Sequence, residues 1–239
     1  MEITTASRQL NTTDGKMELY EARPKDGGPY PAIIVLQEAF GLNPHIKDVT
    51  ERVAREGYVA AAPELYYREP ERVFAYTDLQ KAMPVMNRLQ DPKVMEDIGA
   101  AIAHLKSQST VKGGSIGMTG FCLGGRYAYL TAAHYNKDIK AAVCFYAGGI
   151  PMGNPSPLSR TGEIQCPIYL FFGAKDALIP QEHVEQVRKA LTDQKKNFLL
   201  HVYPDVGHGF VCDARPSYNP EAAKDAWEKF KAFFAQHLK

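Results

Sequence analysis

The stretch "MTGFCLGGRYAYL" at residues 118–130 places one cysteine, Cys122, between a strand-like run and a helix-like run. Glycine stands two positions before it and two positions after it, at Gly120 and Gly124. A sharp turn from a strand into a helix needs small residues at both positions, because larger side chains would collide there. The pattern predicts that the turn presents Cys122 as a nucleophile. A buried, inert thiol in a tight turn is the alternative.

The predicted turn has two chemical consequences. It places the Cys122 thiol at a helix N-terminus, where the helix dipole favours the thiolate form. It also directs the backbone N–H of Leu123 towards the negative charge that develops on a carbonyl oxygen under attack. Acyl transfer through a thiol requires both features.

A nucleophilic thiol needs a base, and the base needs a carboxylate that orients it. "PDVGHGF" places His208 in a glycine-flanked loop after the last strand-like run, and "FFGAKDALIP" places Asp176 after the preceding run. Asp205, three residues before His208, is better explained as a turn residue. His45 is expected on a loop and is a candidate for substrate contact. The chain order of nucleophile, acid and histidine is that of the α/β-hydrolase fold.

Alternating strand and helix patterns surround these residues. Strand-like runs, several of them apolar throughout as in strands buried on both faces, lie at residues 17–23, 31–37, 58–65, 115–121, 141–148, 167–174 and 198–206. Helical patterns lie at residues 46–57, 91–108, 181–193 and 219–238. The alternation predicts one α/β domain over residues 1–239, with a mainly parallel sheet of about seven to eight strands and helices on both faces.

Two segments interrupt this alternation. Residues 66–92 are charged and aromatic, and residues 149–166 are rich in glycine, proline and serine. Each precedes a new core element, so we expect both to cross the carboxyl edge of the sheet, where ligands bind in open α/β folds.

Composition limits the classes of partner. The 239 residues carry a formal net charge of +1 and no run of five or more like charges, which argues against nucleic acid or an anionic membrane surface. No apolar run approaches the roughly 18 residues of a membrane span, and the N-terminus lacks a secretory pattern. The four cysteines form no CxxC pair, which favours free thiols and a cytoplasmic location. A monomer or a homodimer is expected.

Five motifs together resemble the dienelactone hydrolase (carboxymethylenebutenolidase) family across nearly the full chain. They are "QEAFGLN", "GYVAAAPELY", "GFCLGG", "GAKD" and "GHGF". The resemblance implies that Cys122 is the nucleophile and that Asp176 and His208 are its partners.

The segment "EAFGLNPHIKD" follows the strand-like run 31–37, where the fold has its second oxyanion donor. A glutamate there is unexpected, because its negative charge would oppose an oxyanion; a solvated loop carboxylate is the alternative. The resemblance implies that Glu38 bonds the resting thiol and helps to deprotonate it when substrate arrives. It also implies that the backbone N–H groups of Ala39 and Leu123 form the oxyanion hole.

The sequence departs from the family pattern in the substrate pocket. A well-known member of the family uses an arginine shortly after the histidine to bind the carboxylate of the lactone, whereas here Cys212 stands four residues after His208 and the first arginine is Arg215. Arg215 is therefore the first candidate for contact with a substrate carboxylate. Further candidates, for which solvated charge is the alternative, are Arg68, Arg72 and Lys81.

These observations predict a hydrolase without metal or cofactor that cleaves a small lactone or ester of the dienelactone type through an acyl-enzyme. A promiscuous carboxylesterase or thioesterase acting on small activated esters is one alternative. A ligand binder or thiol redox sensor without catalytic activity is another.

Overall fold

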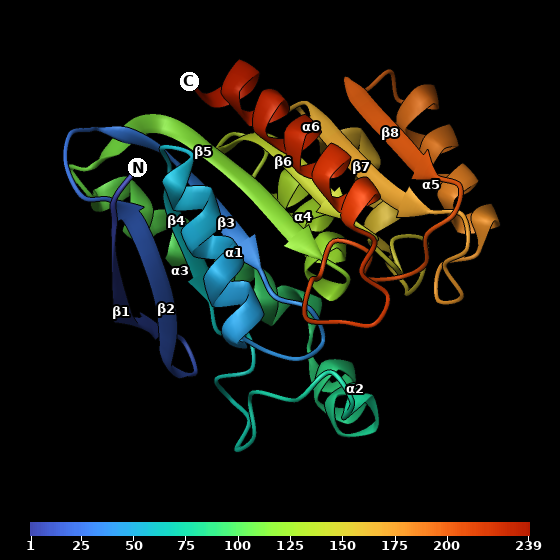
Figure 1. Cartoon of the computed structure of the whole chain (residues 1–239), viewed down its shortest axis with the longest axis horizontal. Helices are drawn as coiled ribbons and strands as arrows, with labels where there is room; N and C mark the ends of the chain where they lie inside the picture. Colours follow the sequence, from blue (N-terminus) through green and yellow to red (C-terminus); the bar gives the residue numbers. More distant parts are fainter. The chain divides into compact units, whose positions relative to one another are not determined.

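The computed structural model describes residues 1–239, and its strands follow the order β1-β2-β4-β3-β5-β6-β7-β8 (Figure 1). The chain divides into two compact units, Met1–Gly117 and Met118–Lys239, with the boundary inside β5 (Val111–Phe121). The α/β prediction is confirmed; the single-domain prediction stays a prediction. No helix has both the length and the apolar character that crossing a membrane requires.

The first unit combines antiparallel and parallel pairing. β1 pairs with β2 and β2 with β4 in antiparallel fashion, while β3 and β4 are parallel. The strands are β1 (Ile3–Thr12), β2 (Gly15–Pro24), β3 (Tyr30–Leu36) and β4 (Val59–Pro63). The helices are α1 (Pro44–Arg55), α2 (Leu79–Arg88) and α3 (Asp91–Ser107).

The second unit continues with parallel strands. β6 pairs with β7 and β7 with β8, and the helices α4 and α6 both pack on β6 (Figure 1). Its elements after β5 are α4 (Leu123–His134), β6 (Ile139–Phe145), the 3-10 helix η1 (Pro157–Glu163), β7 (Ile168–Gly173), α5 (Gln181–Asp193), β8 (Phe198–Tyr203) and α6 (Pro220–Leu238).

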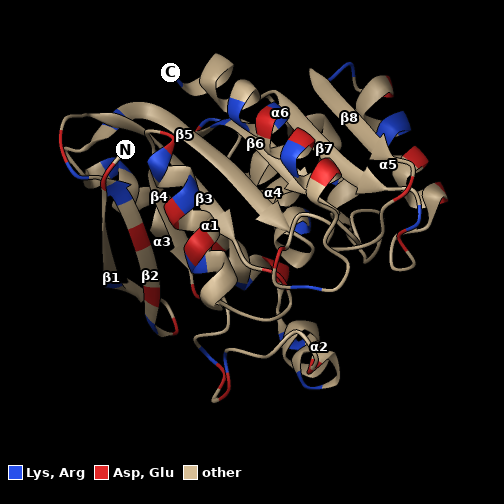
Figure 2. Ribbon diagram, in the orientation of Figure 1, with Lys and Arg blue, Asp and Glu red and all other residues tan.

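Local sequence explains where these elements begin. All six residues of β7, "IYLFFG", are buried, as the continuous apolar run predicts for a strand covered on both faces. The side chains of Asn43 and Asn219 cap α1 and α6 by accepting the N–H of Ile46 and Ala222, each at 3.0 Å. A proline follows each asparagine at the first helical position, where its missing N–H costs nothing. Figure 2 shows charges of both signs interleaved along α1, α5 and α6.

Two elements were not predicted, and one local expectation was wrong. β1 was not predicted because its sequence, "ITTASRQLNT", is polar. The strand lies at the edge of the strand order, where little burial is required. α2 lies within the segment 66–92 despite the internal Pro84, since burial of Ala82 and Val85 compensates for the proline. His45 lies in the first turn of α1 and not on a loop, because the cap at Asn43 begins the helix before it.

Candidate active site

Cys122 occupies a strained turn between β5 and α4. Its φ of 55° and ψ of −116° are unusual for a residue other than glycine. The Cys122 N–H donates to the carbonyl of Phe145 at 3.0 Å, which ties the turn to the end of β6. A Cβ atom on Gly120 would lie 2.1 Å from the carbonyl oxygen of Gly124. The turn therefore requires glycine at position 120, in agreement with the sequence pattern.

Asp176 and His208 form a hydrogen-bonded pair. His208 Nδ1 donates to Asp176 Oδ2 at 2.8 Å, with the proton assigned from the carboxylate partner. The other carboxylate oxygen, Oδ1, accepts the N–H groups of Leu178 at 2.8 Å and Ile179 at 3.2 Å. The carboxylate is fully buried and is held on both oxygens, so it fixes the orientation of the imidazole.

Backbone contacts join the two loops that carry this pair. Ala174 N–H donates to the carbonyl of Tyr203 at 2.8 Å, and Lys175 N–H donates to that of Val206 at 3.0 Å. A Cβ on Gly173 would lie 2.3 Å from the Val206 carbonyl oxygen. Glycine at the end of β7 thus allows the loop of Asp176 and the loop of His208 to touch.

The imidazole of His208 interacts electrostatically with Cys122. Burial opposes its positive charge, but the Cys122 thiolate and the hydrogen bond to Asp176 outweigh burial and raise the pKa of His208 to about 10. Its second ring nitrogen, Nε2, is buried and makes no hydrogen bond of standard geometry. An imidazolium next to a partly exposed thiol can stabilise the thiolate and can later release a proton.

Tyr146 is a site residue that the sequence analysis missed. Its ring packs edge-on against His208 with centroids 5.0 Å apart and against Phe210 at 5.6 Å. The residue is fully buried and has a φ of 36°, a second strained backbone position in this unit. Its position at the end of the strand-like run "AAVCFY" was the available signal, because side chains at strand ends line α/β sites.

Arg215 lies beside the loop that carries His208. Gly209 has a φ of 78°, and a Cβ there would lie 2.5 Å from Arg215 Nη1. The guanidinium thus approaches the backbone one residue after the histidine. Cys212, four residues after His208, is fully buried.

The first unit holds Glu38 and Ala39 in the loop after β3. The Glu38 residue has no exposed surface, so its interpretation as a solvated loop carboxylate is wrong. The Ala39 carbonyl accepts the Tyr66 hydroxyl at 3.0 Å, which fixes this loop. The roles of Glu38 and of the Ala39 N–H stay predictions.

The remaining predicted anion contacts, also in the first unit, have protein partners. Arg68 donates from both terminal nitrogens to the buried carboxylate of Asp97, at 2.7 and 3.0 Å. Arg72 Nε donates to the carbonyl of Glu69 at 3.0 Å.

Lys81 is exposed and pairs with Asp78 at 3.0 Å. His45 is buried, with its ring 6.3 Å from that of Tyr76. Contact of these four side chains with a substrate anion stays a prediction.

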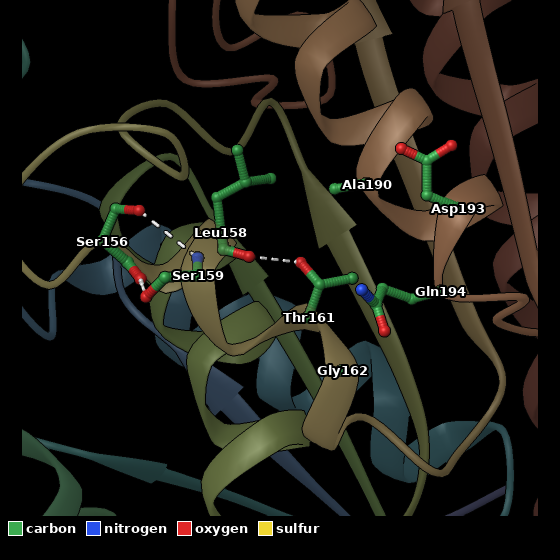
Figure 3. Close-up of a pocket in the computed structure, with 8 residues that line it drawn as sticks. All are labelled: Ser156, Leu158, Ser159, Thr161, Gly162, Ala190, Asp193 and Gln194. Carbon is green, nitrogen blue, oxygen red and sulfur yellow. Dashed lines mark hydrogen bonds between the residues drawn. The ribbon is translucent and has the colours of Figure 1, made fainter.

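A cavity of about 420 Å³ in the second unit is lined by none of the predicted site residues (Figure 3). Residues of η1 and α5 and their neighbours line it: Ser156, Leu158, Ser159, Thr161, Gly162, Ala190, Asp193 and Gln194. It contains no histidine or cysteine, and Asp193, its one charged side chain, pairs with Lys189 at 2.6 Å. Its serine and threonine hydroxyls therefore have no histidine in the lining that could activate them as nucleophiles.

The dienelactone hydrolase family model matches residues 17–238. The chain belongs to the dienelactone hydrolase family. A protein of Synechocystis sp. described as "Putative carboxymethylenebutenolidase" is 41% identical over 227 residues, covering 92% of each chain. A Bradyrhizobium protein described as "Probable 2-oxo-3-(5-oxofuran-2-ylidene)propanoate lactonase" is 32% identical over 232 residues, covering 95% of this chain and 92% of its own.

The crystal structure of a "Putative Dienelactone Hydrolase" from Klebsiella pneumoniae matches with a TM-score of 0.91 and 35% identity. It covers 99% of this chain and all of that one. This member of the dienelactone hydrolase family therefore has the α/β-hydrolase fold and is a hydrolase of ester bonds.

Proposed function

We propose that the chain is a thiol hydrolase of small lactones or esters, with Cys122 as nucleophile, His208 as base and Asp176 as the residue that orients the base. One observation carries this proposal: the buried carboxylate of Asp176 accepts a hydrogen bond from the imidazole of His208, and this imidazole interacts electrostatically with Cys122. A structural thiol needs no such partner, because it functions without changing its protonation.

The first half of the reaction forms a thioester. Cys122 Sγ attacks the carbonyl carbon with its electron pair, and the carbonyl π electrons move to oxygen, where the backbone N–H of Leu123 stabilises them. The oxyanion then collapses, the ring or ester C–O bond breaks, and the leaving oxygen takes the proton of His208 Nε2. An enol leaving group is a good one, so weak acid assistance suffices.

The second half of the reaction releases the acid. Neutral His208 accepts a proton from water as the water oxygen attacks the thioester carbonyl. The new tetrahedral oxyanion collapses, the C–S bond breaks, and the thiolate returns beside the imidazolium. Asp176 accepts the hydrogen bond from Nδ1 throughout and so holds the imidazole in one orientation.

The family relatives and Arg215 together support an anionic lactone as substrate. The Bradyrhizobium protein is named for a lactone whose side chain ends in a carboxylate. In this chain the Arg215 guanidinium lies beside Gly209, next to the proposed base. A guanidinium binds a carboxylate through two parallel hydrogen bonds, which would orient such a lactone towards Cys122.

Parallel assays with a dienelactone and with 4-nitrophenyl acetate test this proposal. We expect turnover of the dienelactone with a much higher kcat/KM than that of the neutral ester. Equal, rapid turnover of both would instead identify a broad carboxylesterase. No turnover of either would contradict the proposal and favour a binder or thiol sensor.

A further inference from the structure

The peptide group between Phe145 and Tyr146, at the end of β6, is held from both sides. The Phe145 carbonyl accepts the N–H of Cys122 at 3.0 Å. The Tyr146 N–H donates to the carbonyl of Phe171 at 2.7 Å, in the neighbouring strand β7 (Figure 1). The ring of Phe145 stacks on those of Phe121 and Phe171, with centroids 4.8 and 4.9 Å away. Because a trans peptide is planar, these contacts fix the plane between the Cys122 turn and β7.

The ring of Tyr146 extends from this fixed plane to the imidazole of His208. The two rings meet at 62° with centroids 5.0 Å apart, and Phe210 packs on Tyr146 at 5.6 Å. The φ angle sets the direction of a side chain relative to the peptide that precedes it, and in Tyr146 it is 36°. An ordinary β-region φ differs from this angle by roughly 100° or more and would turn the ring away from His208. The positive φ therefore joins the fixed peptide to the ring contact.

Burial alone does not explain this backbone angle. The rings of Phe145 and Phe171 are also fully buried, yet neither residue has a positive φ. Only three residues other than glycine do: Cys122, Tyr146 and Lys195. The hydrogen bond from Cys122 to Phe145 connects the first two. Strained backbone persists where its surroundings hold it, and it concentrates at functional sites. The strain at Tyr146 thus belongs to the geometry of the site.

We propose that Tyr146 is a positioning residue that aligns the imidazole of His208 with the Cys122 turn; this inference rests on the proposed function. Asp176 holds the imidazole at Nδ1, 2.8 Å away, and the Tyr146 ring packs against the imidazole ring. Because the Tyr146 ring is attached to the peptide that binds the Cys122 N–H, a shift of the turn carries the ring with it. Nucleophile and base thereby keep one geometry through both halves of the reaction.

NMR of the full chain tests this alignment without turnover. In the wild type, the Nδ1–H proton of His208 should give a downfield resonance, because its hydrogen bond to Asp176 is buried. Tyr146→Phe keeps the ring and should keep the resonance. Tyr146→Leu removes the ring contact, so the imidazole rotates more freely and the proton should be lost to exchange with water. The control Phe234→Leu truncates another fully buried ring, packed on Phe230 in α6, and should keep the resonance.

Kinetics with a dienelactone give a second readout. Tyr146→Leu should lower kcat by about tenfold to a hundredfold and leave KM within about threefold, because the base is misaligned while the groups that bind substrate stay in place. Tyr146→Phe should retain most of the wild-type kcat. Phe234→Leu should lower the melting temperature without this selective loss of kcat.

Two further variants test the backbone angle. Tyr146→Gly and Tyr146→Ala both remove the ring, but only glycine adopts a positive φ without strain. Tyr146→Gly should therefore have the higher melting temperature of the two, against the usual preference for alanine, and should still lose the resonance. A more stable Tyr146→Ala would overturn the proposal, because the angle would then carry no strain.

Other outcomes would also overturn the proposal. They are a wild type without the Nδ1–H resonance, a Tyr146→Leu variant that retains the resonance or the wild-type kcat, and an equal loss in Tyr146→Phe, which would assign the effect to the hydroxyl. If the wild type turns over no ester while Tyr146→Phe and Tyr146→Leu differ in the resonance as expected, the proposed function fails and the positioning of the imidazole stands.

Discussion

The protonation of His208 depends on its two neighbours in the second unit. Asp176 holds Nδ1 at 2.8 Å, and the edge-on ring of Tyr146 restricts rotation of the imidazole. Nε2 is thereby left for the thiol and for a leaving group. Because the Cys122 thiolate and the Asp176 hydrogen bond overcome burial, the imidazolium persists well above the ordinary histidine range.

Cys122 variants should therefore change both activity and the titration of His208. Cys122→Ala should lower kcat/KM at least about a thousandfold, as loss of a nucleophile does in other acyl-transfer enzymes. Cys122→Ser should also be poor, and NMR should show its His208 titrating at lower pH than in the wild type, because a hydroxyl does not supply the thiolate charge.

The stability of the folded state should also change with pH as His208 titrates. A raised folded pKa means that the stabilisation from His208 is complete below about pH 6.5 and is lost as pH rises through about 10. In Cys122→Ser, the stabilisation from His208 should be lost at lower pH than in the wild type.

Retention of more than a tenth of wild-type activity in Cys122→Ala would eliminate the thiol mechanism.

Thiol reagents should distinguish Cys122 from the other cysteines. Cys122 is partly exposed, whereas the other three thiols are buried. Burial also raises the pKa of Cys144, and it raises that of Cys166 to about 12. Iodoacetamide at neutral pH should consequently label Cys122 first, as read by peptide mapping. Preferential labelling of any buried cysteine would count against Cys122 as the activated thiol.

Arg215 should affect substrates according to their charge. Arg215→Ala should raise KM for a carboxylate-bearing lactone about tenfold and leave KM for a neutral ester unchanged, because only the former presents an anion. Arg188→Ala, which removes an exposed arginine of α5, is the matched control for net charge. Equal effects of Arg215→Ala on both substrates would show that Arg215 is structural.

At the scale of elements, the segment after β4 fixes the loop after β3. The Tyr66 hydroxyl donates to the Ala39 carbonyl, and Phe74 N–H donates to the Phe40 carbonyl at 3.0 Å. Gly41, with a φ of 80°, lies so close to the Arg72 carbonyl that a Cβ would be 1.8 Å from its oxygen. The backbone of this loop is therefore held at successive residues.

Glu64 supports the same loop at a cost to stability. It is buried and accepts the Tyr66 N–H at 2.9 Å; burial raises its pKa to about 7, although backbone N–H groups of Tyr66 and Leu42 oppose the shift. A raised folded pKa means that its stabilising contribution is complete below the unfolded value of about 4.3 and is lost as pH rises through 7.

Glu64→Gln should remove this pH dependence, because an amide still accepts the Tyr66 N–H but never ionises. Thermal unfolding should show little difference from the wild type at pH 4 and a gain of up to about 3 kcal/mol at pH 8. Glu69→Gln is the control of opposite sign, since Arg88 lowers the pKa of that carboxyl and its ion pair stabilises the fold at higher pH. A Glu64→Gln variant that is less stable than the wild type at pH 8 would contradict this account.

At the scale of the whole molecule, β5 links the two compact units, because the boundary between them falls within this one strand. If the chain is a single domain, a disturbance in either unit should affect the unfolding of both.

Calorimetry with one variant in each unit tests this expectation. Val53→Ala in the first unit and Leu170→Ala in the second truncate fully buried side chains and should each destabilise by about 2–4 kcal/mol. Each should lower the midpoint of one common transition. Two transitions, each sensitive to only one variant, would identify two separately folding domains.

Local sequence determined much of the fold and of the candidate site. The strand-like runs near β2–β8 have a local cause, because strands buried on both faces are apolar. The paired glycines around Cys122 also have one, because a sharp turn leaves no room for larger side chains. Chain order after successive strands also selected Asp176 and His208, because the carboxyl ends of parallel strands lie at one edge.

Only the tertiary structure decided which groups act on one another. Two contacts join residues that are far apart in sequence: the Asp176–His208 hydrogen bond and the packing of the Tyr146 ring against the imidazole. A third, the approach of Arg215 to Gly209, depends on the conformation of the loop that carries both residues. Periodicity reports only the burial of each position within its own element. Hydrogen bonds, ring contacts and pKa shifts depend on distances between elements, which packing alone sets.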